Sequence, residues 1–291
     1  MNSSVKIIMK KNIATSLLSL ALLMGCVAKY SKTLTQNEKN IIKISKSLVN
    51  KPYEANSVGE GFKSRYNQKP IYIESGFDCQ TFIEYVLAKS ISKDSDEFKK
   101  KIICVKYKNC QVGYHKKNHF FALDWITNNS EQGFISDITS QYEESKAVTK
   151  TISKKNWANT VLEEDSLYLP NLKNESEKQK RVQELKNLFK NTQDQEITQY
   201  FIPSEKITYD FIKKLPEVFF LGIVKENNLK PIIGTDIIVT HVGIGIKENG
   251  KLFLVHASSE SKKIVEIDLV NYFQRDSLQN PNSGMIVLQV K

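Results

Sequence analysis

The chain has 291 residues, of which 40% are hydrophobic and 25% are charged, and its formal net charge is +10. A chain of this length is long enough to bury a hydrophobic core, and it suits one large domain or two small ones. The excess of lysine favours an anionic partner, such as lipid head groups or acidic wall polymers. Many lysines, however, lie in mixed-charge stretches such as residues 175–190, a pattern typical of solvated helix faces.

The N-terminus has the pattern of an export signal. Three lysines precede an apolar run over residues 13–23, which is shorter than the roughly 20 residues that a membrane-spanning helix needs. The Leu-Met-Gly-Cys sequence that follows resembles the lipobox of bacterial lipoproteins, in which Cys26 receives the lipid and becomes the mature N-terminus. This resemblance implies a signal peptide over residues 1–25, a tether over residues 26–35, and a membrane anchor facing the cell envelope.

Anchoring in the envelope restricts the partners of the protein. Val27, rather than Asp, follows Cys26, which by analogy with enteric lipoproteins indicates the periplasmic side of the outer membrane. An exported lipoprotein does not meet nucleic acid. Removal of 25 residues from 291 leaves 266, and the charge falls from +10 to +7 because three lysines and no acid are removed. We find no second membrane segment and expect a monomer with a single domain over residues 36–291, including a polar, helical elaboration around residues 128–215.

The predicted elements are helices in the N-terminal half and mainly strands after residue 217. Thr35-Gln36-Asn37-Glu38 has the form of a capping box and begins a helix that runs toward Asn50. A second helix is predicted from Asp78, and a hairpin is predicted over residues 102–112. The polar residues 128–190 bear helices, and a short helix is predicted at 207–215. Strands are predicted over residues 218–224, 232–246, 252–256, 264–267 and 285–290, so the fold class is α+β.

Three cysteines remain after lipidation, in a compartment that permits disulfides. Cys104 and Cys110 are close in sequence and are the obvious pair. In a hairpin with a two-residue turn at Lys108-Asn109, however, Cys104 and Cys110 lie on opposite faces, so a bridge requires a bulge or another loop length. Cys79 has no evident partner and is expected to be a free thiol.

The sequence around Cys79 has the features of a nucleophile at a helix start. Asp78 is a favourable N-cap, which places Cys79 in the first turn. Unpaired backbone N–H groups and the positive end of the helix dipole favour a thiolate there. The same N–H groups are suited to stabilise an oxyanion on a carbonyl that the sulfur attacks. A buried, inert cysteine is the simple alternative from this motif alone.

Two histidines are predicted to meet on one face of a strand pair. Asn249-Gly250 is a strong hairpin signal, and a two-residue loop pairs residues 248 and 251, and therefore Gly243 with His256. His241 then lies diagonal to His256 on the same face, within about 8 Å at the backbone. Gly243 leaves room between the rings. The spacing therefore predicts a His-His pair.

A thiol facing such a pair fits the papain-type arrangement, with Cys79 as nucleophile, His241 as base and acid, and His256 fixing the tautomer of His241. A Cys-His-His zinc site is the nearest alternative. More than 150 residues separate Cys79 from the two histidines, which fits no compact metal motif, so we expect no metal and no cofactor. Two structural histidines in a core are the remaining alternative.

These motifs also resemble a known family. Lys51-Pro52-Tyr53, Phe77-Asp78-Cys79, Thr240-His241-Val242-Gly243 and His256-Ala257-Ser258 are similar, in order, to the signature blocks of NlpC-type papain-like cell-wall hydrolases. Residues 78–84 resemble the Asp-Cys-x-Thr-Phe-Val-Glu block of the N-acetylmuramoyl-L-alanine amidase-like branch. Residues 118–126, Asn-His-Phe-Phe followed by Asp-Trp-Ile, resemble its aromatic block. The resemblance extends from about residue 40 to the end of the chain.

The resemblance implies a fold in which the nucleophile helix packs on an antiparallel sheet that bears the histidines, with helical insertions. It also implies hydrolysis of the amide between N-acetylmuramic acid and L-alanine in peptidoglycan or muropeptides. The resemblance further implies that Tyr53, Asp78 and His119 line the substrate site, although His119 also suits a core aromatic cluster. Two alternatives are a γ-D-glutamyl-diamino acid endopeptidase and a non-catalytic wall-binding lipoprotein. Related endopeptidases usually have Ser after the nucleophile, where this chain has Gln80.

Overall fold

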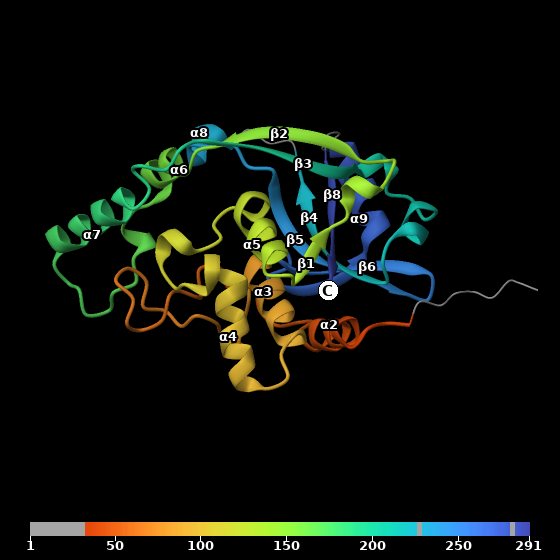
Figure 1. Cartoon of the computed structure of the whole chain (residues 1–291), viewed down its shortest axis with the longest axis horizontal. Helices are drawn as coiled ribbons and strands as arrows, with labels where there is room; N and C mark the ends of the chain where they lie inside the picture. Colours follow the sequence, from red (N-terminus) through yellow and green to blue (C-terminus); the bar gives the residue numbers. More distant parts are fainter. Residues whose placement is uncertain (1–32, 226–228, 280–282) are drawn as a thin grey trace, which may run out of the picture. The chain divides into compact units, whose positions relative to one another are not determined.

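The computed structural model describes residues 33–225, 229–279 and 283–291. The signal peptide, Cys26 and most of the predicted tether lie outside the described residues. Residues 35–291 form one compact unit, built on an antiparallel sheet with helices packed against it (Figure 1). No helix among the described residues is long and apolar enough to cross a membrane.

The helices and strands follow the α+β pattern expected from the sequence. The helices are α2 (Gln36–Ser47), α3 (Cys79–Ser90), α4 (Ser95–Lys106), α5 (Ile126–Glu131), α6 (Lys154–Val161), α7 (Glu175–Asn187), α8 (Lys230–Ile233) and α9 (Leu269–Gln279). The strands are β1 (Ile135–Asp137), β2 (Lys146–Ile152), β3 (Gln195–Pro203), β4 (Val218–Val224), β5 (Val239–Glu248), β6 (Lys251–Ser258), β7 (Lys263–Asp268) and β8 (Gly284–Val290). In the described residues the sheet has the order β2-β3-β8-β4-β5-β6-β7, and β1 pairs with β8.

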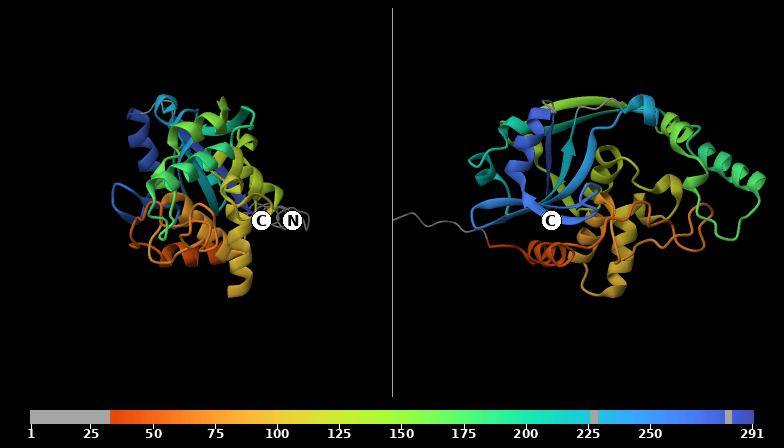
Figure 2. Two further views of the ribbon diagram at one scale, coloured as in Figure 1. Left: turned by 90° about the vertical axis from the view of Figure 1, so that its left-hand side faces the viewer. Right: turned by 180° about the vertical axis from the view of Figure 1, so that it is seen from behind.

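The two faces of the sheet carry different helices. On one face, Leu269, Val270 and Phe273 of α9 pack in a core cluster with residues of β4, β6 and β8. On the other, α3 packs against β5 and β6, and Trp125 contacts Phe220 of β4. Figures 1 and 2 show α9 and α3 on opposite sides of the strands. The helix α3 is therefore held between the sheet and the helices α2 and α4.

Several predicted boundaries are confirmed. Thr35 forms the capping box of α2 with Glu38, as the sequence indicated. The Asn249-Gly250 turn has positive φ at both residues and pairs Glu248 with Lys251, which is the geometry of a type I′ hairpin. The strand predicted over residues 232–246 begins later, at Val239, because residues 230–233 form α8 and Gly234 ends this helix in the left-handed conformation.

The hairpin predicted over residues 102–112 is wrong. Residues 102–106 are the end of α4, which Asp94 caps through the N–H groups of residues 96 and 97, and residues 108–110 form a 3₁₀ turn. The buried residues Phe98, Ile102 and Val105 recur at helical spacing, and this periodicity outweighs the β-branched composition. Cys104 and Cys110 form a disulfide across the turn that follows the helix, where Asn109 has a left-handed φ of 56°. The bridge therefore uses a different loop from the one considered in the sequence analysis.

The segment around residues 128–215 contains strands as well as the expected helices. The strands β1, β2 and β3 lie within it, and the predicted helix at 207–215 is a single 3₁₀ turn over Phe211–Lys214. The paired β2 and β3 are largely exposed along their outer parts. Exposure alternates along both strands, but polar residues such as Lys150 and Gln199 lie on the less exposed face, so the apolar period-two signal is weak in the sequence.

Candidate active site

Cys79 is the first residue of α3, and a reciprocal capping box fixes the start of this helix. Asp78 Oδ1 accepts a hydrogen bond from the Thr81 N–H at 2.8 Å, and the Asp78 N–H donates to Thr81 Oγ1 at 2.9 Å. The segment before the helix is held from the other side, because the Phe77 N–H donates to the carbonyl of Pro52 and the Glu54 N–H donates to the carbonyl of Phe77. The position predicted for Cys79 is thus confirmed, and its thiol is free.

The thiol lies where the ladder between β5 and β6 ends. The last residue pair of this ladder is Ile244 with Val255, so the N-terminal part of β5 is open on this side. The N–H groups of Val242, Gln80 and Cys79 face the sulfur and lower its pKa. Three donors around one sulfur are suited to hold a negative charge that forms there during a reaction.

The resting charge of the thiol differs from the sequence-based expectation. Burial, and after it the charge of the neighbouring Asp78, raises the pKa of Cys79 to about 12, even though the three N–H groups lower it. The expected thiolate at the helix start is therefore corrected to a protonated thiol in the free protein. The helix dipole was the only effect visible in the sequence, whereas desolvation is set by the tertiary structure.

The predicted His-His pair is confirmed. His241 Nε2 and His256 Nδ1 are 2.6 Å apart, and the two rings are nearly perpendicular, at 84°. A single hydrogen lies between the two nitrogens when both rings are neutral. When His241 carries that hydrogen on Nε2, its Nδ1 has a free lone pair. No hydrogen bond joins the thiol to His241 among the described residues, but both residues line one cavity.

Burial also sets the charge of the two rings. It lowers the pKa of His241 to about 3, with a further contribution from the nearby His256 and Lys225. It lowers the pKa of His256 to about 4. Both rings are therefore neutral near pH 7, so each has one nitrogen without a proton. The remaining nitrogen of His256, Nε2, is buried with no partner among the described residues.

Gly243 makes this arrangement of the rings possible. A Cβ at this position would lie 2.6 Å from Leu254 Cδ1, 3.0 Å from the carbonyl oxygen of Val255 and 3.2 Å from His256 Cβ. Real Cβ atoms do not tolerate the shortest of these distances, so β6 or its side chains would have to move. The space that the sequence predicted between the two histidines is thus required by close packing.

Substitution of Gly243 by alanine should therefore displace His256. We expect a loss of about 1–3 kcal/mol in the free energy of unfolding from overpacking. We also expect kcat/KM to fall by about 10²-fold, because an ångström-scale displacement of a catalytic group has effects of that size. Urea unfolding and steady-state kinetics measure the two changes. Gly113→Ala is a matched control, since its Cβ would have no neighbour closer than 3.8 Å; equal effects in both variants would contradict the prediction.

The other predicted site residues lie around the thiol. Tyr53 pairs with Phe77 in an isolated parallel bridge. Burial raises the pKa of the Tyr53 hydroxyl most, and the charges of Cys79 and Asp78 raise it further, which places this ring beside Cys79. His119 lies in an aromatic cluster, with its ring centroid 4.7 Å from that of Trp157. Its Nε2–H donates to the carbonyl of Tyr114 at 2.7 Å, and burial lowers its pKa to about 3.

Cys79 and His241 line a cavity of about 220 Å³. Most of its lining residues are apolar and a few are polar, which is the usual composition of a small-ligand site. Its wall includes residues that the sequence analysis did not assign, and Trp157 is one of them. An isolated tryptophan in a polar stretch was the available signal. The cavity is lined by Cys79, Gln80, His119, Phe120, Phe121, Ala122, Ile152, Trp157, Ile233, Ile237, Ile238, Val239, Thr240, His241 and Val242.

The geometry of the histidines does not suit a zinc site. Two metal ligands direct their lone pairs at a common point about 2 Å from each nitrogen. Here His241 Nε2 and His256 Nδ1 face each other directly at hydrogen-bond distance. Among the described residues, no group of three or more His, Cys, Asp or Glu side chains could hold a metal ion.

Comparison with known proteins places the chain in a family. A model of the AmiA-like family, described as N-acetylmuramoyl-L-alanine amidase-like, matches residues 43–279. The chain belongs to this amidase-like family. The matched range contains Cys79, His241 and His256, together with Tyr53 and His119. No curated protein matches the sequence.

Solved structures have the same fold as this family member. A Legionella pneumophila protein of the DUF1460 family model has a TM-score of 0.82 and 27% identity, covering 88% of this chain and 89% of its own. An N-acetylmuramoyl-L-alanine amidase from Bacteroides uniformis has a TM-score of 0.64 and 22% identity, covering 87% and 99%. A putative xylanase from Bacteroides fragilis has a TM-score of 0.61 and 22% identity, covering 85% and 100%.

Proposed function

We propose that this family member is a cysteine amidase that cleaves the bond between N-acetylmuramic acid and L-alanine in peptidoglycan or its fragments. The observation that carries the proposal is that Cys79 and His241 line one cavity. Outside this lining, His256 Nδ1 bonds to His241 Nε2 and leaves His241 Nδ1 as the base. The chain's membership of the amidase-like family supports this choice of bond. The nucleophile helix packed on an antiparallel sheet supports the NlpC-type papain-like assignment.

The proposed reaction begins from a neutral thiol and a neutral imidazole. As the sulfur attacks the lactyl carbonyl, His241 Nδ1 takes the thiol proton and a tetrahedral oxyanion forms. The protonated His241 then gives this proton to the alanine nitrogen, the C–N bond breaks, the stem peptide leaves as an amine, and a thioester to the lactyl group remains on Cys79. Water, deprotonated by His241, hydrolyses the thioester and restores the thiol. His256 holds the His241 ring throughout, and the N–H groups at the start of α3 stabilise the oxyanion.

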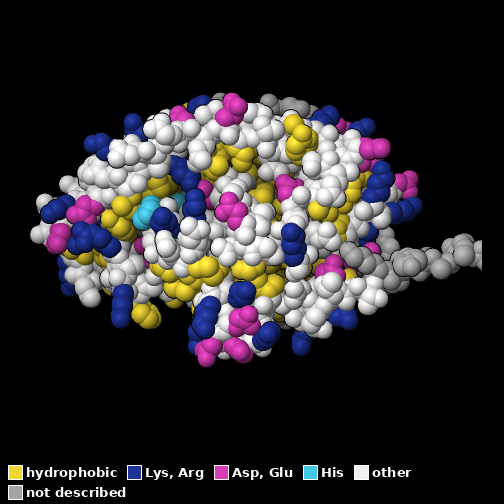
Figure 3. All heavy atoms as spheres, viewed as in Figure 1, with side chains coloured by type: hydrophobic (Ala, Val, Ile, Leu, Met, Phe, Trp, Pro, Cys, Tyr) yellow, Lys and Arg dark blue, Asp and Glu magenta, His cyan; other side chains and the backbone are white. Residues whose placement is uncertain are grey.

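We place the protein in the cell envelope, as a monomer anchored through a lipid on Cys26. The apolar signal and the lipobox-like sequence support this location. On the face drawn in Figure 3, Lys and Arg side chains are interspersed with Asp and Glu rather than gathered in one patch. The net positive charge therefore acts as a diffuse attraction toward anionic wall or lipid groups.

Product analysis tests the proposed bond. The soluble chain from Val27 to Lys291 is incubated with disaccharide-peptide fragments, including 1,6-anhydro forms, beside a Cys79→Ala control, and the products are identified by mass spectrometry. Release of the complete stem peptide from the sugar, only with the intact thiol, is the expected result. A cut inside the peptide would make the protein an endopeptidase. The absence of any thiol-dependent product would favour a wall-binding lipoprotein.

The pH profile tests the proposed base. Because the pKa of His241 is lowered to about 3 and that of His256 to about 4, the imidazoles remain neutral well below the ordinary histidine range. We therefore expect kcat/KM to stay nearly constant from about pH 7 to about pH 5 and to fall only at lower pH. An acidic limb centred near the ordinary histidine value of about 6.5 would contradict the prediction. Melting temperatures across the same range separate loss of activity from unfolding.

A further inference from the structure

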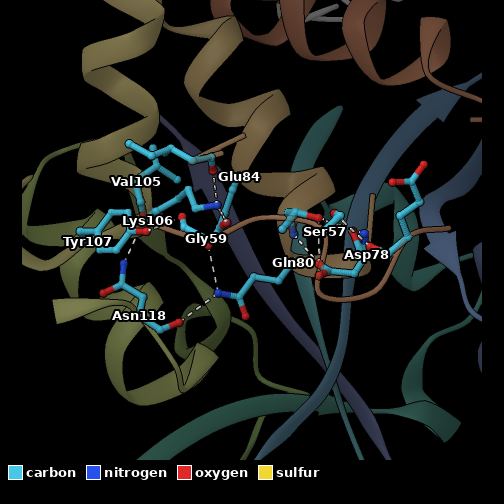
Figure 4. A network of polar contacts seen from close by, with 12 residues as sticks. Ser57, Gly59, Asp78, Gln80, Glu84, Val105, Lys106, Tyr107 and Asn118 are labelled. Carbon is cyan, nitrogen blue, oxygen red and sulfur yellow. Dashed lines mark hydrogen bonds and ion pairs between the residues drawn. The ribbon is translucent and has the colours of Figure 1, made fainter. Parts of the chain in front are cut away.

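The side chain of Gln80, next to the nucleophile, is held in one orientation. Its Nε2 donates to Glu84 Oε1 at 2.9 Å and to the carbonyl oxygen of Asn118 at 3.0 Å (Figure 4). Both partners are acceptors, so neither can face the amide oxygen without repulsion. The oxygen and nitrogen of this amide are therefore assigned by their surroundings.

The anchor of Gln80 is itself buried and rigid. The side chain of Glu84 is 2% exposed and lies 3.7 Å from Lys106 Nζ, which is equally buried. Lys106 Nζ also donates to the carbonyl of Ile71 at 2.7 Å. Asn118 is fixed through the bond from its Nδ2 to the carbonyl of Val105 at 2.9 Å. Figure 4 shows this network running from the end of α4 to the start of α3.

The amide oxygen of Gln80 has a free acceptor position. Among the described residues, no donor bonds to Gln80 Oε1, and this atom is absent from the buried unpartnered groups, so it is accessible. Gln80 lines the cavity that holds Cys79 and His241. A ligand that fills this cavity removes water from Oε1, and the acceptor is then unpaired unless the ligand supplies a donor.

We infer that Gln80 is a substrate-positioning residue whose Oε1 accepts a hydrogen bond from a substrate amide N–H beside the scissile bond. The inference rests on the proposed function. Two groups of the substrate have this chemistry: the 2-acetamido N–H of the muramic acid and the N–H of the second residue of the stem peptide. Because Gln80 directly follows Cys79, a bond to either group fixes the carbonyl relative to the sulfur.

Two substrate analogues test this role and separate the sources. In one, an acetoxy group replaces the 2-acetamido group; in the other, an ester replaces the peptide bond that carries the second N–H. We expect wild-type kcat/KM to fall about tenfold for one analogue, the effect of one hydrogen bond. In Gln80→Met the same analogue should react as well as the parent substrate. The analogue that shows this dependence identifies the donor.

The inference is overturned if the wild-type enzyme turns over both analogues as fast as the parent. It is also overturned if the fall in kcat/KM from the parent to the analogue is as large in Gln80→Met as in the wild type. The wild-type comparison needs no variant, so it stands even if Gln80→Met folds poorly. Calorimetric binding of parent and analogues to Cys79→Ala gives the same comparison without turnover. If the parent substrate yields no thiol-dependent product, the proposed function fails and the role of Gln80 fails with it. If the parent is cleaved but both analogues are cleaved equally fast, only the role of Gln80 is overturned.

Discussion

Cys79→Ala is expected to reduce amide hydrolysis by about 10⁴-fold or more, the scale seen when a nucleophile of a catalytic unit is removed. No other free cysteine lies among the described residues, because Cys104 and Cys110 are joined. The variant should fold normally, since the capping box of α3 uses Asp78 and Thr81 and not the thiol. Removal of one heavy atom should change the free energy of unfolding by about 1 kcal/mol.

The measurement is the rate of stem-peptide release, followed by chromatography, together with a urea unfolding curve for each variant. Cys104→Ala with Cys110→Ala is the matched control for loss of sulfur away from the cavity. This double variant should lose stability but keep the chemical step, because neither residue lines the cavity. Turnover by Cys79→Ala comparable with that of the wild type would show that the thiol is not the nucleophile.

Lys106→Met is expected to lower the free energy of unfolding by about 3–5 kcal/mol, because it leaves the Glu84 carboxylate buried without its partner. Burial raises the pKa of Glu84, whereas the charge of Lys106 lowers it. Burial in turn lowers the pKa of Lys106 to about 8. Without the lysine, Glu84 is driven to take up a proton. Glu84 also anchors Gln80, so the damage extends to the position next to the nucleophile.

Urea unfolding of three variants distinguishes charge from packing. The double variant Glu84→Met with Lys106→Met should regain most of the lost stability, because no unpaired charge remains. Lys99→Met breaks an exposed ion pair with Asp96 and should cost at most about 1 kcal/mol. A Lys106→Met variant as stable as Lys99→Met would show that the buried pair does not hold this part of the fold.

The parts of the site that were predicted correctly depend on interactions between near neighbours in the chain. Asp78 caps the helix that begins at Cys79 because the capping box spans only four residues. The turn at Asn249-Gly250 sets the register of β5 and β6, and the strand period then brings His241 to His256. In both cases the local geometry has few alternatives, so residue type and spacing were sufficient.

The incorrect predictions concern segments whose structure depends on residues that are distant in the chain. Residues 102–106 have apolar, β-branched side chains that suit a strand, but they complete α4 because this helix buries them against α3. The strands β2 and β3 show little apolar alternation, since their less exposed face carries polar residues such as Lys150 and Gln199. The partner of a segment, and not its composition, determined its structure in both places.

Local sequence was thus sufficient for the helix that begins at Cys79, the hairpin and the pairing of the two histidines. The tertiary structure alone decided the charge of the thiol, the orientation of Gln80 and the apolar wall of the cavity. Burial raises the pKa of Cys79 to about 12, against the effect of the helix start that the sequence indicated. The physical reason is that desolvation depends on every element packed around a group, whereas capping and register depend on a few adjacent residues.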